Sequence, residues 1–190
     1  MPMNVPVAPA PAAVAVIVPP ATAVAPAPPE AATRVPLEMR AAIEDLYARY
    51  VKCLDDGNYA AWPDFFVEDC VYKIQARENY DRGLPLALMA FESRAMLKDR
   101  VFGATTTLYH QPYYQRHLVS SLLMHGAHDG SVQVEANYAV FRTKQGALTD
   151  VLNAGRYVDE IVTVGGALKF RSKQCVYDSE LVPNSLIYPI

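Results

Sequence analysis

The chain has few cysteines, a single tryptophan and no concentration of charge. Its three cysteines, at positions 53, 70 and 175, are an odd number, and no two have the spacing of a metal site or a disulfide framework. The formal net charge is −3 at pH 7 and the basic residues are scattered, so no nucleic-acid-binding stripe is indicated. These absences argue against a disulfide-stapled secreted domain and predict a protein of the reducing cytoplasm.

Charge is also missing from the first part of the chain, where proline and alanine are abundant. Residues 1–36 contain ten of the fifteen prolines and eleven alanines, and no charged side chain precedes Glu30. With little to bury and many residues lacking a backbone N–H, residues 1–35 are predicted to be a disordered tail. Neither a secretory signal nor a membrane span is expected, because no Lys or Arg precedes Arg34 and prolines interrupt the apolar run. The remaining residues, 36–190, suffice for one compact domain.

Hydrophobic periodicity predicts helices in the first half of this domain. Residues 37–55 repeat apolar side chains every three or four positions, as an amphipathic helix does, and Gly57 suits a left-handed cap after it. A short second helix is expected over residues 59–66 and a third over residues 86–102. Residues 70–77 alternate between two faces and predict a strand.

The second half of the domain predicts a run of strands. Alternating segments are expected as strands at residues 116–124, 132–143, 149–164 and 168–177. Each connection carries a glycine of the kind that tight hairpins favour. Helices followed by antiparallel strands predict an α+β domain, with about three helices packed on a curved, largely antiparallel sheet.

Six segments, in order along the chain, resemble a known family. They are WPDFFVEDCVYKIQARENYDRGLPLA, ESRAMLKDRVFG, LYHQPYYQRHLV, ANYAVFRT, NAGRYVDEIV and FRSKQCVYDSELVPNSLIYPI. On these segments the chain resembles the small (beta) subunits of aromatic-ring-hydroxylating dioxygenases, the Rieske non-haem iron oxygenases. Within that family it is most similar to the small subunit of salicylate 5-hydroxylase. The resemblance covers residues from about 37 to 190, and the Ala/Pro-rich tail is a departure from it.

The resemblance implies a fold and a role. The fold would be the cystatin-like cone shared with nuclear-transport-factor-like proteins. The role would be that of a structural subunit with no catalytic, cofactor-binding or metal-binding residue, in a cytoplasmic enzyme of aromatic compound catabolism. Three copies would form a trimer and carry three large (alpha) subunits in an α3β3 assembly. The large subunit would hold the Rieske [2Fe–2S] cluster and a mononuclear Fe(II), supplied with electrons through a reductase and a ferredoxin. Neither nucleic acid nor membrane would be a partner.

Arginines and tyrosines that suit a protein–protein surface are frequent in the middle of the chain. Arginine offers a planar donor fork for carboxylates, and tyrosine offers rigid contact area with a polar tip. The predicted subunit-contact residues are Arg82, Arg94, Arg100, Tyr109, Tyr113, Tyr114, Arg116, His117 and Tyr188. For each of them the alternative is a role inside its own domain, as an ion pair or as a ring that closes the cone.

A second interpretation is a stand-alone cone-fold dehydratase or isomerase. Its pocket would use acid–base groups, since a carboxylate and an imidazole share proton transfer near neutral pH. The candidates are Asp69, Tyr72, Tyr109, His110, His117 and Tyr138. No close-spaced pair among them demands this chemistry, and the chain has no Cys-x-His or Cys-x-x-His motif of the kind that binds a Rieske cluster.

The chain ends on large apolar residues, Leu186, Ile187, Tyr188 and Ile190. Leaving such side chains in water would forgo about 1.5–3 kcal/mol for each one that could be fully buried. The segment is therefore expected to dock, either on its own sheet or in a neighbouring subunit. The resemblance favours burial within the assembled oligomer.

Overall fold

The computed structural model describes residues 35–128, 130–179 and 186–190. All but the last residue of the predicted tail, 1–35, lie outside this range, so its disorder stays a prediction. Among the described residues, no helix is both long and apolar enough to cross a membrane.

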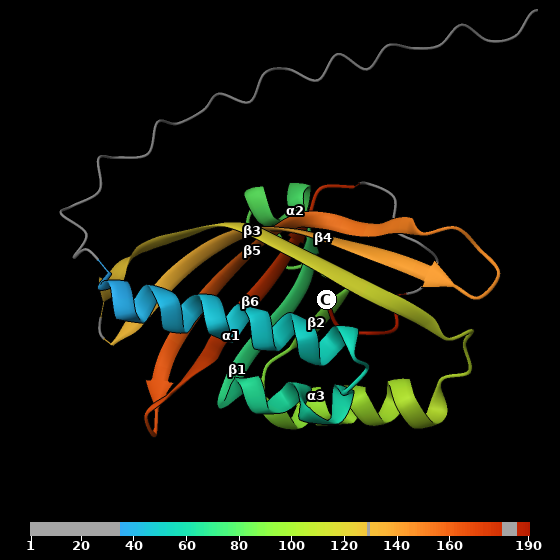
Figure 1. Cartoon of the computed structure of the whole chain (residues 1–190), viewed down its shortest axis with the longest axis horizontal. Helices are drawn as coiled ribbons and strands as arrows, with labels where there is room; N and C mark the ends of the chain where they lie inside the picture. The colour runs from blue at the N-terminus through green and yellow to red at the C-terminus, as the bar shows by residue number, and fades with distance from the viewer. Residues whose placement is uncertain (1–34, 129, 180–185) are drawn as a thin grey trace, which may run out of the picture. The chain divides into compact units, whose positions relative to one another are not determined.

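Six strands form one sheet in the order β2-β1-β6-β5-β4-β3. The strands are β1 (Phe66–Ala76), β2 (Met89–Phe91), β3 (Tyr113–His128), β4 (Ser131–Lys144), β5 (Asp150–Val164) and β6 (Ala167–Tyr177). Strands β3 to β6 form the predicted antiparallel meander. The first strand joins it by pairing with the last, because β1 and β6 run parallel. The prediction of a largely antiparallel sheet is confirmed, and Figure 1 shows its curvature.

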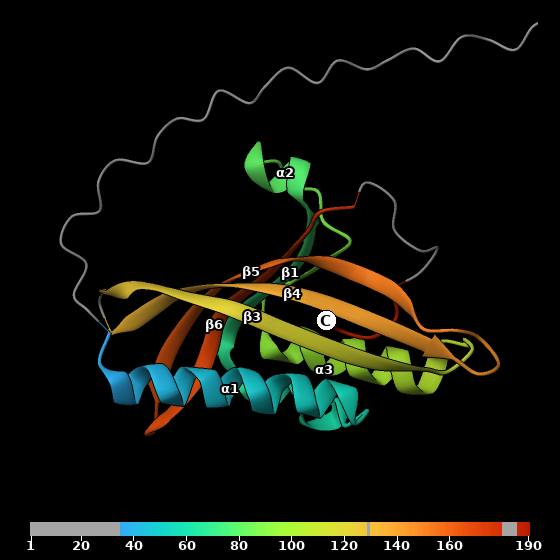
Figure 2. The same cartoon turned by 45° about the horizontal axis from the view of Figure 1, so that its top comes forward.

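Helices cover one face of this sheet, which we call the inner face. They are α1 (Leu37–Asp55), the 3₁₀ helix η1 (Tyr59–Phe65) and α3 (Arg94–Phe102), which continues as the π-helical turn η2 (Gly103–Thr107). A further short helix, α2 (Arg77–Asp81), is not among them. In both views α1 and α3 lie on the same side of the strands, and α2 lies on the other side (Figures 1 and 2). The predicted α+β class is therefore confirmed.

The predicted third helix, 86–102, is wrong in its first part. Met89–Phe91 forms the short strand β2, which pairs with β1 through Ile74–Met89 and Tyr72–Phe91. The helix begins at Arg94 because Ser93 caps it, its hydroxyl accepting a hydrogen bond from the Met96 N–H at 3.3 Å. Met89 and Phe91, whose spacing is compatible with a helix, thus lie in a strand instead. The short helix α2 was not predicted, and β1 begins at Phe66 rather than at residue 70.

Aromatic side chains fill the space between the helices and the inner face. Trp62, Tyr50, Tyr72, Tyr157, Phe66 and Phe170 are the largest fully buried rings. They meet mainly edge to face, as Trp62 and Tyr72 do with ring centroids 5.0 Å apart at 85°. The last described residue, Ile190, belongs to the same cluster. The interior of the fold is therefore packed with rings, several of which carry a hydroxyl group.

Candidate functional site

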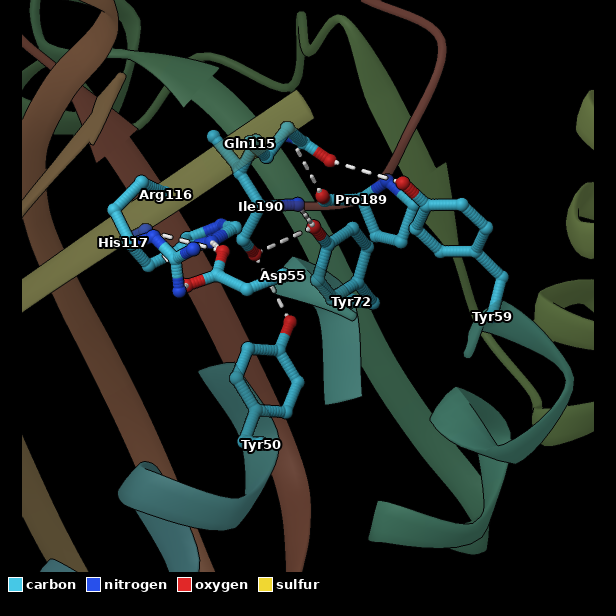
Figure 3. A network of polar contacts seen from close by, with 9 residues as sticks. All are labelled: Tyr50, Asp55, Tyr59, Tyr72, Gln115, Arg116, His117, Pro189 and Ile190. Atoms are coloured by element: carbon cyan, nitrogen blue, oxygen red, sulfur yellow. Dashed lines mark hydrogen bonds and ion pairs between the residues drawn. The ribbon is translucent and has the colours of Figure 1, made fainter. Parts of the chain in front are cut away.

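Residues 186–190 return to the interior of the fold, and Figure 3 shows Pro189 and Ile190 among side chains from α1, η1, β1 and β3. Ile190 is completely buried, and Ile187 and Tyr188 are each only 9% exposed. The predicted docking of the chain end is confirmed for these residues. Of the two alternatives, docking within its own chain is the one that the structure shows.

The backbone of Ile190 is held by two tyrosines. The Tyr50 and Tyr72 hydroxyls donate to its main-chain oxygen at 2.9 and 3.0 Å, and its N–H donates to the Tyr72 oxygen at 3.0 Å (Figure 3). The Cys175 sulfur lies 3.5 Å from the same main-chain oxygen. Burial raises the pKa of Tyr50 and of Tyr72 well above the usual value, so both remain protonated donors.

Two further side chains bind the residues that precede Ile190. The Gln115 amide donates to the Pro189 oxygen at 3.4 Å, and the Tyr59 hydroxyl donates to the Gln115 oxygen at 3.3 Å (Figure 3). The Arg100 guanidinium donates to the main-chain oxygens of Leu186 and Ile187 at 2.8 and 2.6 Å. Charge-assisted donors of this kind are the stronger ones, so Arg100 is a main anchor of the segment.

After Ile190, Tyr188 is the second side chain of the segment that packs against the rest of the chain. Its ring stacks on Tyr59 with centroids 4.5 Å apart at 13°, and its hydroxyl lies 2.7 Å from His110 Nε2. Tyr113 packs against the same ring at 4.9 Å. Docking of the segment therefore ties η1, the loop before β3 and the start of β3 together.

A buried carboxylate joins the end of α1 to β3. Asp55 Oδ1 lies 2.6 Å from His117 Nδ1, and the His117 N–H donates to both Asp55 oxygens at 3.1 and 3.2 Å (Figure 3). Arg116 approaches the same carboxylate at 3.5 Å but keeps 71% of its side chain exposed. His117 Nε2 is buried with no hydrogen-bond partner among the described residues. The contact orients the imidazole and satisfies an N–H on the edge strand of the sheet.

An ion pair lies deeper in the core. Lys173 Nζ is 2.8 Å from Asp159 Oδ2 with both side chains fully buried, and the Tyr47 hydroxyl donates to the same carboxylate. The ammonium lies 3.4 Å from the Tyr157 ring centroid, with three further aromatic rings at 4.7–4.9 Å. Burial raises the pKa of Asp159, while Lys173 and then Tyr47 act to lower it. The pair is thus compensated inside the core.

The predicted acid–base candidates do not converge on one pocket. Asp69 lines a surface hollow of about 510 Å³, and His117 lines a different groove of about 390 Å³ between α1 and β3. Tyr72 binds Ile190, His110 binds Tyr188, and the Tyr138 hydroxyl donates to Asn153 at 2.5 Å. Tyr109 is fully exposed. The six residues therefore lie at separate places in the fold.

The predicted subunit-contact residues divide into groups by environment. An inner set, Arg100, Tyr113 and Tyr188, contacts the chain's own residues 186–190 or belongs to them. His117 is likewise buried against Asp55.

An outer set, Tyr109, Tyr114 and Arg116, is exposed. Tyr109 is fully exposed and Tyr114 is 78% exposed, and Arg116 is as described above. Arg82 and Arg94 form surface ion pairs, with Glu78 at 2.8 Å and with Glu68 at 2.7 Å.

Sequence reasoning missed the groups that organise the interior: Asp55, Gln115, Asp159 and Lys173. A signal existed for the ion pair. Asp159 and Lys173 lie directly opposite each other across the hairpin that turns at Gly165 and Gly166. Each is a charged residue on the buried side of an alternating strand, a position that requires a partner.

Among the described residues, no group of three or more His, Cys, Asp and Glu side chains could hold a metal ion.

Comparison with known proteins gives the chain's relationships. The fold is the predicted nuclear-transport-factor-like cone. Residues 49–184 match the family model described as "Ring hydroxylating beta subunit", and the chain belongs to that family.

Individual relatives agree with this assignment. The anthranilate 1,2-dioxygenase small subunit of Burkholderia cepacia is 34% identical over 145 residues, which is 76% of this chain and 90% of the relative. The beta 2 subunit of the terephthalate 1,2-dioxygenase terminal oxygenase component of Comamonas sp is 25% identical over 143 residues, covering 75% and 93%. A solved Novosphingobium aromaticivorans structure, described as the beta subunit of an aromatic-ring-hydroxylating dioxygenase, is 39% identical with a TM-score of 0.73, covering 79% and 95%.

Proposed function

We propose that this chain is the structural, non-catalytic small subunit of an oxygenase that hydroxylates an aromatic ring. The observation that carries the proposal is the filled interior. In a cone-fold enzyme this space would be the substrate pocket, whereas here Ile190 and the surrounding rings occupy it. Fold alone would not decide between these roles, since one fold hosts many functions.

The partner in this proposal is a large (alpha) subunit. It would carry the Rieske [2Fe–2S] cluster, the mononuclear Fe(II) and the substrate pocket, in a cytoplasmic α3β3 assembly fed by a reductase and a ferredoxin. Membership of the ring-hydroxylating beta-subunit family supports a multi-subunit oxygenase. In this proposal the chain contributes placement and stability to the complex.

The proposed substrate class is an aromatic carboxylic acid. Two relatives are named for anthranilate and terephthalate dioxygenases, and both compounds carry a carboxylate on a benzene ring. Salicylate, a hydroxybenzoate, belongs to the same chemical class, and its 5-hydroxylation is the specific reaction we propose.

The outer set is the proposed contact surface for another subunit. Tyr114, Arg116 and Leu118 alternate along β3 and point away from the inner face, and all three are exposed. Among the described strands, β3 also lies at the edge of the sheet and pairs with β4 alone. An exposed arginine beside a tyrosine and an apolar side chain has the composition of an interface core.

Light scattering tests the proposal. The chain is measured alone and then with its proposed large subunit, with iron content determined for each peak. A trimer alone and an equimolar, iron-containing hexamer together are the expected results. A colourless monomer or dimer that does not bind the large subunit would favour the stand-alone dehydratase or isomerase. Arg116→Ala should weaken assembly, whereas the matched control Arg49→Ala, on the exposed side of α1, should leave it unchanged.

A further inference from the structure

Residues 186–190 contact the rest of the chain as a bound peptide does. The segment is not part of the sheet. The main-chain oxygens of Leu186, Ile187, Pro189 and Ile190 accept hydrogen bonds, and every donor is a side chain. These donors, the Cys175 thiol among them, come from five different elements, α1, β1, α3, β3 and β6. Side chains that donate to main-chain oxygens can bind a peptide backbone whether or not it is attached to the chain.

Two anchors supply the apolar part of the recognition. Ile190 is fully buried among the core rings, and the Tyr188 ring stacks on Tyr59 and bonds to His110. Pro189 separates them, and it fixes its own backbone dihedral and offers no N–H that would need a partner. A Tyr-Pro-Ile sequence therefore matches the site in apolar area and in hydrogen bonding.

We propose that the cone contains a peptide-binding site, which residues 186–190 fill in cis. Its ligand class is a short apolar peptide with an aromatic residue and a branched aliphatic residue on either side of a proline. The peptide backbone is hydrogen-bonded by Arg100, Gln115, Tyr50 and Tyr72, and the peptide side chains pack against the core rings and Tyr59. This inference does not depend on the proposed role in an oxygenase.

The test weakens the occupant and leaves the site intact. A covalently attached segment has an effective concentration on the order of millimolar, so an added peptide competes poorly with it. The full chain is therefore prepared with Tyr188→Gly and Ile190→Gly together, which removes both anchors. The probe is the peptide Leu-Ile-Tyr-Pro-Ile with an N-terminal fluorophore, followed by fluorescence anisotropy.

The expected result is saturable binding to this double variant and binding at least about tenfold weaker to the wild-type chain. On the double-variant background, Arg100→Ala should weaken binding about tenfold, because two charge-assisted hydrogen bonds are lost. Arg49→Ala is the matched control and should have no effect, because the Arg49 side chain is exposed and pairs with Asp45. The peptide Leu-Ile-Tyr-Pro-Gly should bind at least about tenfold more weakly, since it buries no isoleucine.

Four outcomes would overturn the proposal. They are no binding to the double variant, an equal loss with Arg49→Ala, equal binding of the glycine peptide, and displacement of the probe by benzoate as effectively as by unlabelled peptide. The last outcome would define a small-molecule site instead.

If the double variant does not fold, excess peptide should restore its cooperative thermal unfolding, and a failure to restore it counts against the site. None of these measurements involves the large subunit, so they stand or fall separately from the oxygenase assignment.

Discussion

The inner and outer sets use the same residue types in opposite ways. Arg100 turns inward and holds the main-chain oxygens of Leu186 and Ile187, while Arg116 remains largely in solvent. Tyr113 packs against Tyr188, whereas its neighbour Tyr114 is exposed. For the two tyrosines the difference follows from position, because successive residues of β3 point to opposite faces. The two arginines differ because they lie on different elements, Arg100 on α3 and Arg116 on β3. Residue type suggests a contact surface, and the alternation of the strand decides which side chains can form it.

The largest expected effect is at the buried ion pair. Lys173→Ala should lower the free energy of unfolding by about 3–5 kcal/mol, because it leaves the Asp159 carboxylate buried without its counter-charge. Denaturant unfolding measures this loss. Asp159→Leu with Lys173→Met, which removes both charges, should lose less, and an equal loss would show that packing rather than charge is responsible.

The stability lost in the Lys173→Ala variant should depend on pH in a definite direction. A carboxyl group whose pKa is raised by folding binds a proton more readily in the folded state, so stability falls as pH rises above the unfolded value. The pKa of Asp159 is already raised by burial, and Lys173→Ala removes the main group that opposes this. Its destabilisation relative to wild type should therefore be smaller at pH 4 than at pH 7, and a constant difference would contradict this account.

Ile190→Ala and Leu118→Ala compare the stability cost of truncating a side chain in the interior and on the outer face. The side chain is fully buried, so the substitution should cost about 2–5 kcal/mol of unfolding free energy. Leu118→Ala removes the same number of carbon atoms from an exposed side chain on β3 and should cost no more than about 0.5 kcal/mol. Thermal unfolding of the two variants checks the comparison. Similar shifts in Tm would mean that residue 190 is not packed as described.

Arg100→Ala and Arg116→Ala separate the two sets directly. Loss of the Arg100 hydrogen bonds should reduce stability by about 1.5–3 kcal/mol. Arg116→Ala should change stability by less than about 0.5 kcal/mol, and its effect should appear in binding of the large subunit instead. Denaturant unfolding and light scattering on the same two samples give both readings. A reversed pattern would exchange the assignments of the two sets.

The smallest expected effect is on thiol chemistry. Burial raises the pKa of Cys175 to about 12 and that of Cys70 to about 11. Cys53 is half-buried, so it should react first with a thiol reagent at pH 8, and its rate should rise with pH as the thiolate forms. The other two should react only after unfolding. Rapid labelling of Cys175 in the folded chain would show that the interior opens readily.

Much of the fold was predictable because its signals are local. The 37–55 helix and the Gly57 cap are confirmed, with Gly57 at φ +71°, as are the hairpins of the meander. The start of α3 was mistaken because apolar spacing at Met89 and Phe91 suits a helix as well as a strand. Only the tertiary pairing with β1 decides between the two.

The site was less predictable, because its polar partners are distant in sequence. The apolar character of residues 186–190 predicted docking. Nothing local to Arg100 or Gln115 indicates that it would bind a main-chain oxygen more than seventy positions away. The Asp159–Lys173 pair is the exception, since hairpin register alone places the two side chains opposite each other.

The parallel pairing of β1 with β6 has a consequence for the order of folding. During synthesis β1 emerges early, and its only neighbour for a long time is the three-residue strand β2. Its apolar side chains, Tyr72 and Ile74 among them, stay unburied until β6 has been synthesised and pairs with it. Contacts so distant along the chain slow folding to about milliseconds to seconds. During this interval an unpaired β1 is the surface most open to aggregation, so conditions that slow aggregation more than folding should raise the yield of folded protein.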